Sequence, residues 1–91
     1  MYRLKKGNKE MILRFSHKAP RLEADREEIC RMLLAGAIDI EKITKVGSSI
    51  LFHERLGAVI IEAEQFPSLL LTVRAAIPKH AWFPDEKAVG K

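Results

Sequence analysis

The stretch RLEADREEICRMLLAG, residues 21–36, carries the clearest helical pattern in the chain. Leu22, Ile29, Met32 and Leu33 recur at helical spacing, and Cys30 lies beside them. An apolar stripe of this kind must be buried against another element, so it predicts an amphipathic helix over residues 21–35.

Both ends of this helix carry sequence signals. Gly36 predicts the C-terminal cap, because glycine readily adopts the left-handed conformation that ends helices. Asp25 followed by Glu28 resembles a capping box with Asp as its first residue. The helix is therefore expected to begin at Asp25, or one turn earlier at Pro20.

Outward from the helix, the apolar pattern changes to the alternation of strands. We expect strands over residues 11–17, 49–55, 58–64 and 69–77. Residues 37–46 alternate and then slip by one residue between Ile40 and Ile43, which favours a bulged or broken strand. Because the connections are short, the sequence predicts an α+β fold in which a single helix packs on a curved antiparallel sheet, in the order β-α-β-β-β-β.

The 91 residues are enough for one domain, which we divide into three parts. Residues 1–10 are expected to form a basic arm, residues 11–77 the α+β core and residues 78–91 an irregular tail. Trp82 and Phe83 are too large to be left exposed without a reason, so we expect them to fold back onto the helix or the sheet edge.

Composition excludes several functional classes. The charge is +4, from 16 Lys and Arg against 12 Asp and Glu, which favours an acidic partner such as nucleic acid but also suits an ordinary soluble protein. No apolar run approaches the roughly 18 residues of a membrane helix, so we expect a cytoplasmic protein. With one Cys, three scattered His and no phosphate-binding glycine loop, we predict no disulfide, no metal and no cofactor.

Strand alternation assigns side chains to two faces of the sheet. The face beneath the helix is expected to carry Leu13, Phe15, Ile50, Phe52, Val59, Ile61, Leu69, Leu71, Val73, Ala75 and Ile77. The opposite face is expected to carry Arg14, Ser16, Leu51, His53, Arg55, Glu62, Glu64, Thr72 and Arg74.

The polar face has the residue types that metal-independent RNA cleavage requires. His53 can act as base or acid, while Arg14, Arg55 and Arg74 can hold phosphate. The competing interpretation is an ordinary solvated face, on which Arg74 or Arg55 pairs with Glu62.

Residues outside the strands allow similar alternatives. His17, at the end of the first strand, either enters the site from the loop or satisfies the start of the helix. Lys5 and Lys6 belong to the basic arm, which can lie along phosphates or be disordered. Cys30 is expected in the core, within the apolar stripe of the helix.

Residues 12–84 resemble a small family of uncharacterised bacterial and phage domains that is grouped with the RelE/BrnT-like toxins. The resemblance rests on His17, the helix end and following residues at 32–38, the strand 70–73, and Pro78 followed by Trp82. It implies a RelE/barnase-like fold and metal-independent ribonuclease activity, often neutralised by an antitoxin. Arg74 stands where the family pattern tends to have tyrosine, and residues 18–23 depart from its Arg-rich stretch.

Three functional hypotheses follow. The first is a toxin-like, metal-independent endoribonuclease. Its catalytic residues would be His53, His17 and Thr72, and its RNA-binding residues Arg14, Arg55, Arg74, Lys5 and Lys6.

The second hypothesis is a non-catalytic module that binds RNA or a protein, such as an antitoxin or a host protein. The third is a structural or inhibitory protein that dimerises along an exposed sheet edge, so that a monomer and a homodimer both stay open.

Overall fold

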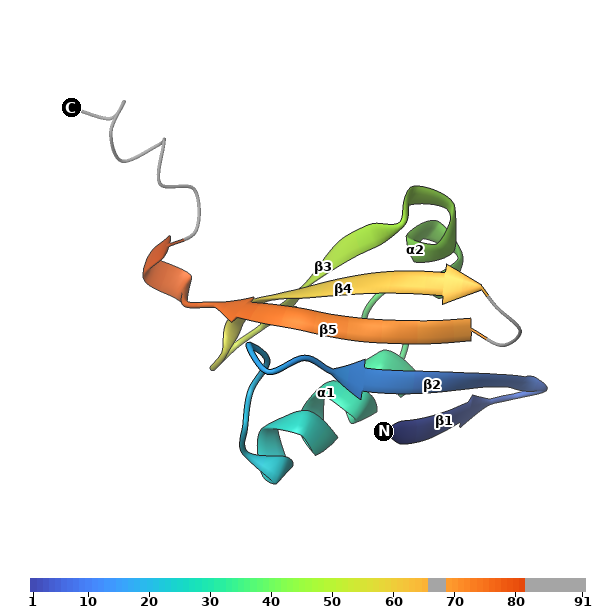
Figure 1. Cartoon of the computed structure of the whole chain (residues 1–91), viewed down its shortest axis with the longest axis horizontal. Helices are drawn as coiled ribbons and strands as arrows, with labels where there is room; N and C mark the ends of the chain where they lie inside the picture. The colour runs from blue at the N-terminus through green and yellow to red at the C-terminus, as the bar shows by residue number, and fades with distance from the viewer. Residues whose placement is uncertain (66–68, 82–91) are drawn as a thin grey trace.

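The computed structural model describes residues 1–65 and 69–81 and shows an α+β fold with one five-stranded sheet (Figure 1). In chain order the elements are β1 (Tyr2–Lys6), β2 (Lys9–Phe15), α1 (Glu23–Leu34), α2 (Ile40–Val46), β3 (Ser48–His53), β4 (Gly57–Gln65), β5 (Leu69–Ile77) and the 3₁₀ turn η1 (Lys79–Ala81). The residues expected to fold back from the tail, Trp82 and Phe83, lie outside the described residues.

The sheet is mixed rather than antiparallel throughout. Its strand order is β1-β2-β5-β4-β3, and β2 runs parallel to β5 while the other neighbouring pairs are antiparallel. Parallel neighbours need a long crossover, which α1, α2, β3 and β4 supply here. The sequence prediction assumed that short connections join all neighbouring strands, and therefore missed the crossover.

The prediction of a single helix is wrong, because residues 40–46 form α2 instead of a bulged strand. Ile40 and Ile43 are three residues apart and turn toward the core on one face of this helix. Asp39 caps the helix by accepting a hydrogen bond from the Glu41 N–H at 3.0 Å. The three-residue spacing of Ile40 and Ile43, which we interpreted as a slip in strand alternation, is therefore the spacing of one helical turn.

The helix α1 ends as predicted and begins differently. Gly36, with a φ of +81°, donates its N–H to Leu33 O, while the Ala37 N–H bonds to Met32 O. These two bonds form a Schellman motif. At the other end the helix begins at Glu23 without a side-chain cap, so the predicted Asp25–Glu28 capping box is absent.

The residues expected to form a basic arm form β1 and the beginning of β2. Tyr2 and Leu4 of β1 point to the core side, where Leu4 is buried opposite Met11. The Tyr2 hydroxyl donates a hydrogen bond to Glu23 of α1, and the Tyr2 ring packs edge-on against Phe15 at 5.4 Å between centroids. These contacts attach β1 to the rest of the fold.

Both helices cover one face of the sheet, here called the inner face, and the core lies between them and the strands. The core residues with no exposed surface are Leu13, Ile29, Leu33, Ile43, Val59, Ile61, Leu71 and Val73.

Two faces were assigned wrongly. On β3, Leu51 and His53 face inward and Ile50 and Phe52 are exposed, because Leu51 lies directly opposite buried Val59. On β5, Ala75 and Ile77 were expected to face inward, but Ala76 is the residue that packs against the core. A bulge there pairs Ile60 with Ala75 but Ile61 with Val73, so the alternation shifts by one residue at Arg74.

The turn between β3 and β4 depends on Gly57, whose φ is +99°. A Cβ at this position would lie 2.0 Å from the carbonyl oxygen of Ile77. We therefore expect Gly57→Ala to lower the free energy of unfolding by about 3 kcal/mol, through backbone strain plus a clash with the main chain. Urea denaturation followed by circular dichroism measures this.

The matched control is Gly7→Ala. Gly7 also has a positive φ, of +63°, but a Cβ at this position would have no other atom within 4 Å. We expect a loss of only about 1 kcal/mol, from backbone strain alone. Equal losses at the two glycines would contradict the close approach of Gly57 to β5.

Candidate functional site

The candidate site lies on the outer face of the sheet, opposite the helices. There β2, β5 and β4 place Arg14, Thr72 and Glu62 side by side in one cross-strand row, since Arg14 pairs with Thr72 and Thr72 with Glu62. The Nη2 atom of Arg14 lies 3.3 Å from Thr72 Oγ1. Next to this row, Nη1 of Arg74 forms an ion pair with Glu62 Oε2 at 3.2 Å.

The chain leaves β2 through a tight turn that stays attached to β5. Ser16 donates its N–H to Val73 O at 2.9 Å and its hydroxyl to Arg74 O at 2.6 Å. The Ala19 N–H then bonds to Ser16 O, which closes the turn. His17 and Lys18 are exposed at its tip, so two donors on Ser16 hold these side chains beside the Arg74 bulge.

This turn and the bulge of β5 border a shallow groove of about 450 Å³ on the outer face. The lining residues are Ser16, His17, Lys18, Ile60, Glu62, Arg74 and Ala75. We call it the outer groove. It brings together one imidazole, one carboxylate and two cations, the groups that can bind a phosphodiester and move a proton.

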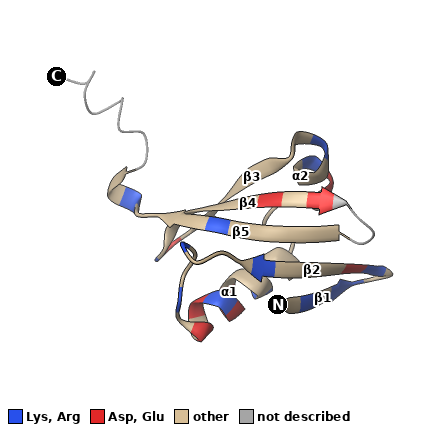
Figure 2. Ribbon diagram, viewed as in Figure 1, with Lys and Arg blue, Asp and Glu red and all other residues tan. Residues whose placement is uncertain are grey.

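Cations extend from the outer groove toward the β1 edge. Arg14 on β2 continues the row, and Arg3 and Lys5 of β1 point to the same face because their neighbours Tyr2 and Leu4 point inward. Figure 2 shows basic residues on β1, β2 and β5, and acidic ones on β4 and near the beginning of β2. The outer face is therefore mostly basic on the β1–β2 side and carries carboxylates toward β4.

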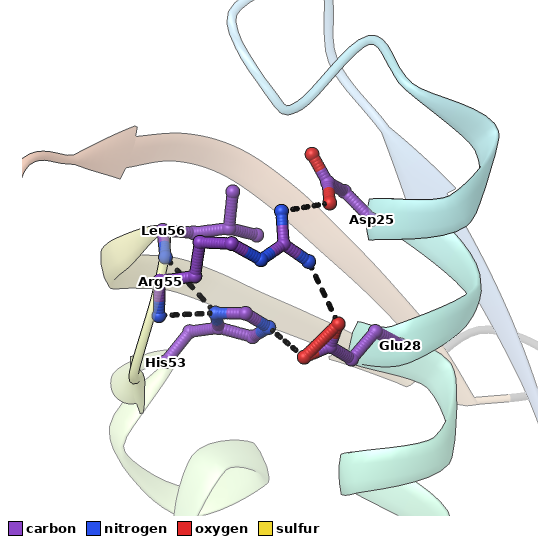
Figure 3. A network of polar contacts seen from close by, with 5 residues as sticks. All are labelled: Asp25, Glu28, His53, Arg55 and Leu56. Carbon is purple, nitrogen blue, oxygen red and sulfur yellow. Dashed lines mark hydrogen bonds and ion pairs between the residues drawn. The ribbon is translucent and has the colours of Figure 1, made fainter.

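His53 does not belong to this face. Its side chain is 1% exposed and lies under α1, where Nε2 is 2.7 Å from Glu28 Oε2 (Figure 3). Its Nδ1 accepts the N–H groups of Arg55 and Leu56, at 3.1 and 2.9 Å. An Nδ1 that accepts hydrogen bonds carries no proton, so the ring proton is on Nε2, the nitrogen that lies beside Glu28.

Arg55 also turns toward α1 instead of the outer face. Its Nη1 lies 2.6 Å from Asp25 Oδ1 and its Nη2 lies 2.8 Å from Glu28 Oε1. The hydrogen bonds from these two carboxylates raise the pKa of Arg55. Partial burial would raise the pKa of Glu28, but the hydrogen bond from Arg55 and the neighbouring His53 outweigh it, so that pKa is lowered.

We call Asp25, Glu28, His53 and Arg55 the turn clamp, because they attach the β3–β4 turn to α1. Asp25 is only 6% exposed and its charge is compensated by Arg55. The imidazole satisfies two backbone N–H groups of the turn that would otherwise lack a partner there. Polar groups paired in this way fix a conformation and leave little capacity for a substrate.

The structure thus divides the predicted site residues into separate groups. His17, Thr72, Arg14 and Arg74 lie on the outer face, and Lys5 lies on the same face at the sheet edge. His53 and Arg55 belong to the turn clamp on the inner side.

Lys6 lines a different cavity, of about 490 Å³, between the β1–β2 hairpin and the segment before α2. There Lys9 pairs with Glu41 at 3.3 Å, and both of these side chains are exposed. This cavity shares no lining residue with the outer groove, so Lys6 is not part of the candidate site.

Sequence reasoning missed Lys18 in the groove and the role of Asp25 and Glu28. The sequence did indicate that Asp25 and Glu28 could bind one cation together, because two carboxylates three residues apart lie on one face of a helix. We assigned that pair to a capping box, although it binds Arg55.

Comparison with known proteins adds no relative: no family model, no curated protein and no solved structure matches the chain. Within residues 1–65 and 69–81, no helix is long and apolar enough to cross a membrane. In the same part of the chain, no three His, Cys, Asp or Glu side chains are grouped so that they could hold a metal ion.

The turn clamp predicts a pH dependence of stability. Because the pKa of Glu28 is lowered in the folded protein, ionised Glu28 stabilises the fold above the ordinary pKa of 4.5. That contribution is lost as the pH falls through the folded-state value. We therefore expect Glu28→Gln to destabilise the protein at pH 7 and to differ progressively less from the unchanged protein below pH 4.5, in urea denaturation at each pH.

The control is Glu27→Gln, one residue away on the exposed side of α1. It removes the same charge from the same helix without touching the clamp. A Glu27→Gln effect as large and as pH-dependent as that of Glu28→Gln would show that overall charge, and not the clamp, is responsible.

Proposed function

We propose that the chain is a metal-independent endoribonuclease whose site is the outer groove. The observation that supports this proposal is the presence of His17, Glu62 and Arg74 around one groove on the outer face of the sheet. RNA can supply its own nucleophile, the 2′-hydroxyl, so a protein needs only a base, an acid and cations.

Each group of the groove has a role in this scheme. The carboxylate of Glu62 takes the proton of the 2′-hydroxyl, and the 2′-oxygen forms a bond to phosphorus. The bond from phosphorus to the 5′-oxygen breaks, and protonated His17 donates a proton to that leaving oxygen. The products are a 2′,3′-cyclic phosphate and a free 5′-hydroxyl.

The cations stabilise the charge that develops on the phosphoryl oxygens. Arg74 already lies 3.2 Å from Glu62, so the guanidinium is held beside the proposed base. Lys18 adds a second cation from the turn, and Arg14 continues the row along the face. We assign Thr72 to phosphate binding instead of proton transfer, because its hydroxyl already accepts a hydrogen bond from Arg14.

A second candidate function is RNA binding without cleavage. The pairing of Arg74 with Glu62 favours it, because the carboxylate that would take the proton is already engaged by a guanidinium. In that case the exposed cations of β1, β2 and β5 bind the RNA backbone, and His17 adds a stacking or hydrogen-bonding surface. The two functions differ only in turnover, which separate assays of cleavage and binding resolve.

Cleavage is tested with purified protein and mixed RNA in EDTA. We expect discrete products ending in a 2′,3′-cyclic phosphate, and a rate lower by about 100-fold or more in His17→Ala. The control is His80→Ala, which removes another exposed histidine, from η1. Equal rates in the two variants would exclude His17 from the mechanism, and intact RNA at high protein concentration would leave the binding function.

Binding is tested by the salt dependence of affinity for single-stranded RNA. Each phosphate contact makes log K fall more steeply with log salt, by about 0.7 in slope. Arg74→Ala is therefore expected to weaken binding and to make that fall shallower by about the same amount. Arg31→Ala is the matched control, because Arg31 is an exposed arginine in the last turn of α1, on the helical side. Equal losses in both variants would contradict binding at the outer face.

A further inference from the structure

The cavity beside Lys6, between the β1–β2 hairpin and the segment that precedes α2, has the properties of a small-molecule site. We call it the hairpin cavity. Its lining residues are Lys6, Lys9, Met11, Gly36, Ile38, Asp39, Ile40 and Glu41. Its volume of about 490 Å³ is within the range of about 300–1,000 Å³ that ligand pockets occupy. None of these residues has a role in the proposed cleavage of RNA, so the hairpin cavity is an independent site.

Two lysines face each other at the end of the hairpin. Lys6 and Lys9 are direct cross-strand partners, and both side chains line the hairpin cavity. Like charges directly opposite each other destabilise a strand pair unless they are compensated. Lys9 is compensated, because its Nζ lies 3.3 Å from Glu41 Oε1. Within residues 1–65 and 69–81 Lys6 forms no ion pair, so its positive charge is not compensated there.

The ammonium of Lys6 lies against the end of α1. A Cβ at Gly36 would lie 3.2 Å from Lys6 Nζ, so the ammonium rests on the glycine that ends this helix. The C-terminal end of a helix carries a partial negative charge, which favours a cation at this place without neutralising it. The helix therefore helps to hold the Lys6 charge at the wall of the cavity.

The rest of the lining combines an apolar surface with two carboxylates. Met11 is 2% exposed, and Ile38 and Ile40 are half-buried and pack against the core. A ligand with an apolar body can cover these side chains beside the cation. Asp39 and Glu41 line the same cavity, and they disfavour a ligand that carries several negative charges.

We propose that the hairpin cavity binds a small organic carboxylate with an apolar body. The carboxylate pairs with Lys6, the cation that lacks a partner among the described residues, and the apolar body covers Ile38 and Ile40. A single negative charge is favoured over the two charges of a phosphate monoester, because Asp39 and Glu41 repel the second charge.

Nuclear magnetic resonance of the ¹⁵N-labelled full chain tests the site, with hexanoate as the probe. We expect saturable shifts at the amides of Gly36, Ile38 and Ile40. Hexan-1-ol has the same chain without the charge and is expected to bind about fivefold more weakly. Butyrate is expected to bind about tenfold more weakly, because it buries two fewer methylene groups. Shifts confined to the outer face, or equal affinities for hexanoate and hexan-1-ol, would overturn the proposal.

Three variants test the electrostatic part of the proposal. Lys6→Gln is expected to weaken hexanoate binding about fivefold. Asp39→Asn is expected to strengthen it, since a repelling charge is removed while asparagine still caps α2. The matched control is Lys5→Gln, which removes a charge from the neighbouring residue of β1 on the other face of the sheet, and it is expected to leave the affinity unchanged. Equal losses in Lys6→Gln and Lys5→Gln, or weaker binding by Asp39→Asn, would contradict the proposed site.

Discussion

The parallel pairing of β2 with β5 is the constraint on which the rest of the structure depends. It places Phe15, the last residue of β2, opposite Val73, so the chain leaves β2 directly beside the bulge at Arg74. Two hydrogen bonds from Ser16 then hold the following turn against β5. His17 and Arg74, which are 57 positions apart in the chain, come to line one groove only because these two strands are neighbours.

Sequence reasoning succeeded where a pattern was long and one-sided. The helix α1 and its glycine end follow from an apolar stripe over several turns and a residue that tolerates a left-handed backbone. It failed for α2, because seven residues hold only two inward isoleucines, and that spacing also fits a strand with a bulge. It failed for β1 because Tyr2 and Leu4 are a short alternation among basic residues.

The candidate site was predictable in part for a related reason. Arg14, Thr72 and Arg74 were expected on one face, and the structure places them there with Arg74 paired to Glu62. His53 was assigned to that face by assuming that Ile50 and Phe52 are core residues. Only the register of β3 against β4 decides otherwise, and register depends on long-range pairing that a single sequence does not display.

The division of polar groups between the two faces separates stability from the proposed chemistry. On the inner side the Nδ1 atom of His53 accepts hydrogen bonds from the turn backbone, and Arg55 pairs with Asp25 and Glu28, so these residues stabilise the β3–β4 connection. On the outer side His17 and Lys18 are exposed, so substrate contacts there need not disturb the core. Substitutions on the outer face should therefore report on function, whereas substitutions in the clamp report first on folding.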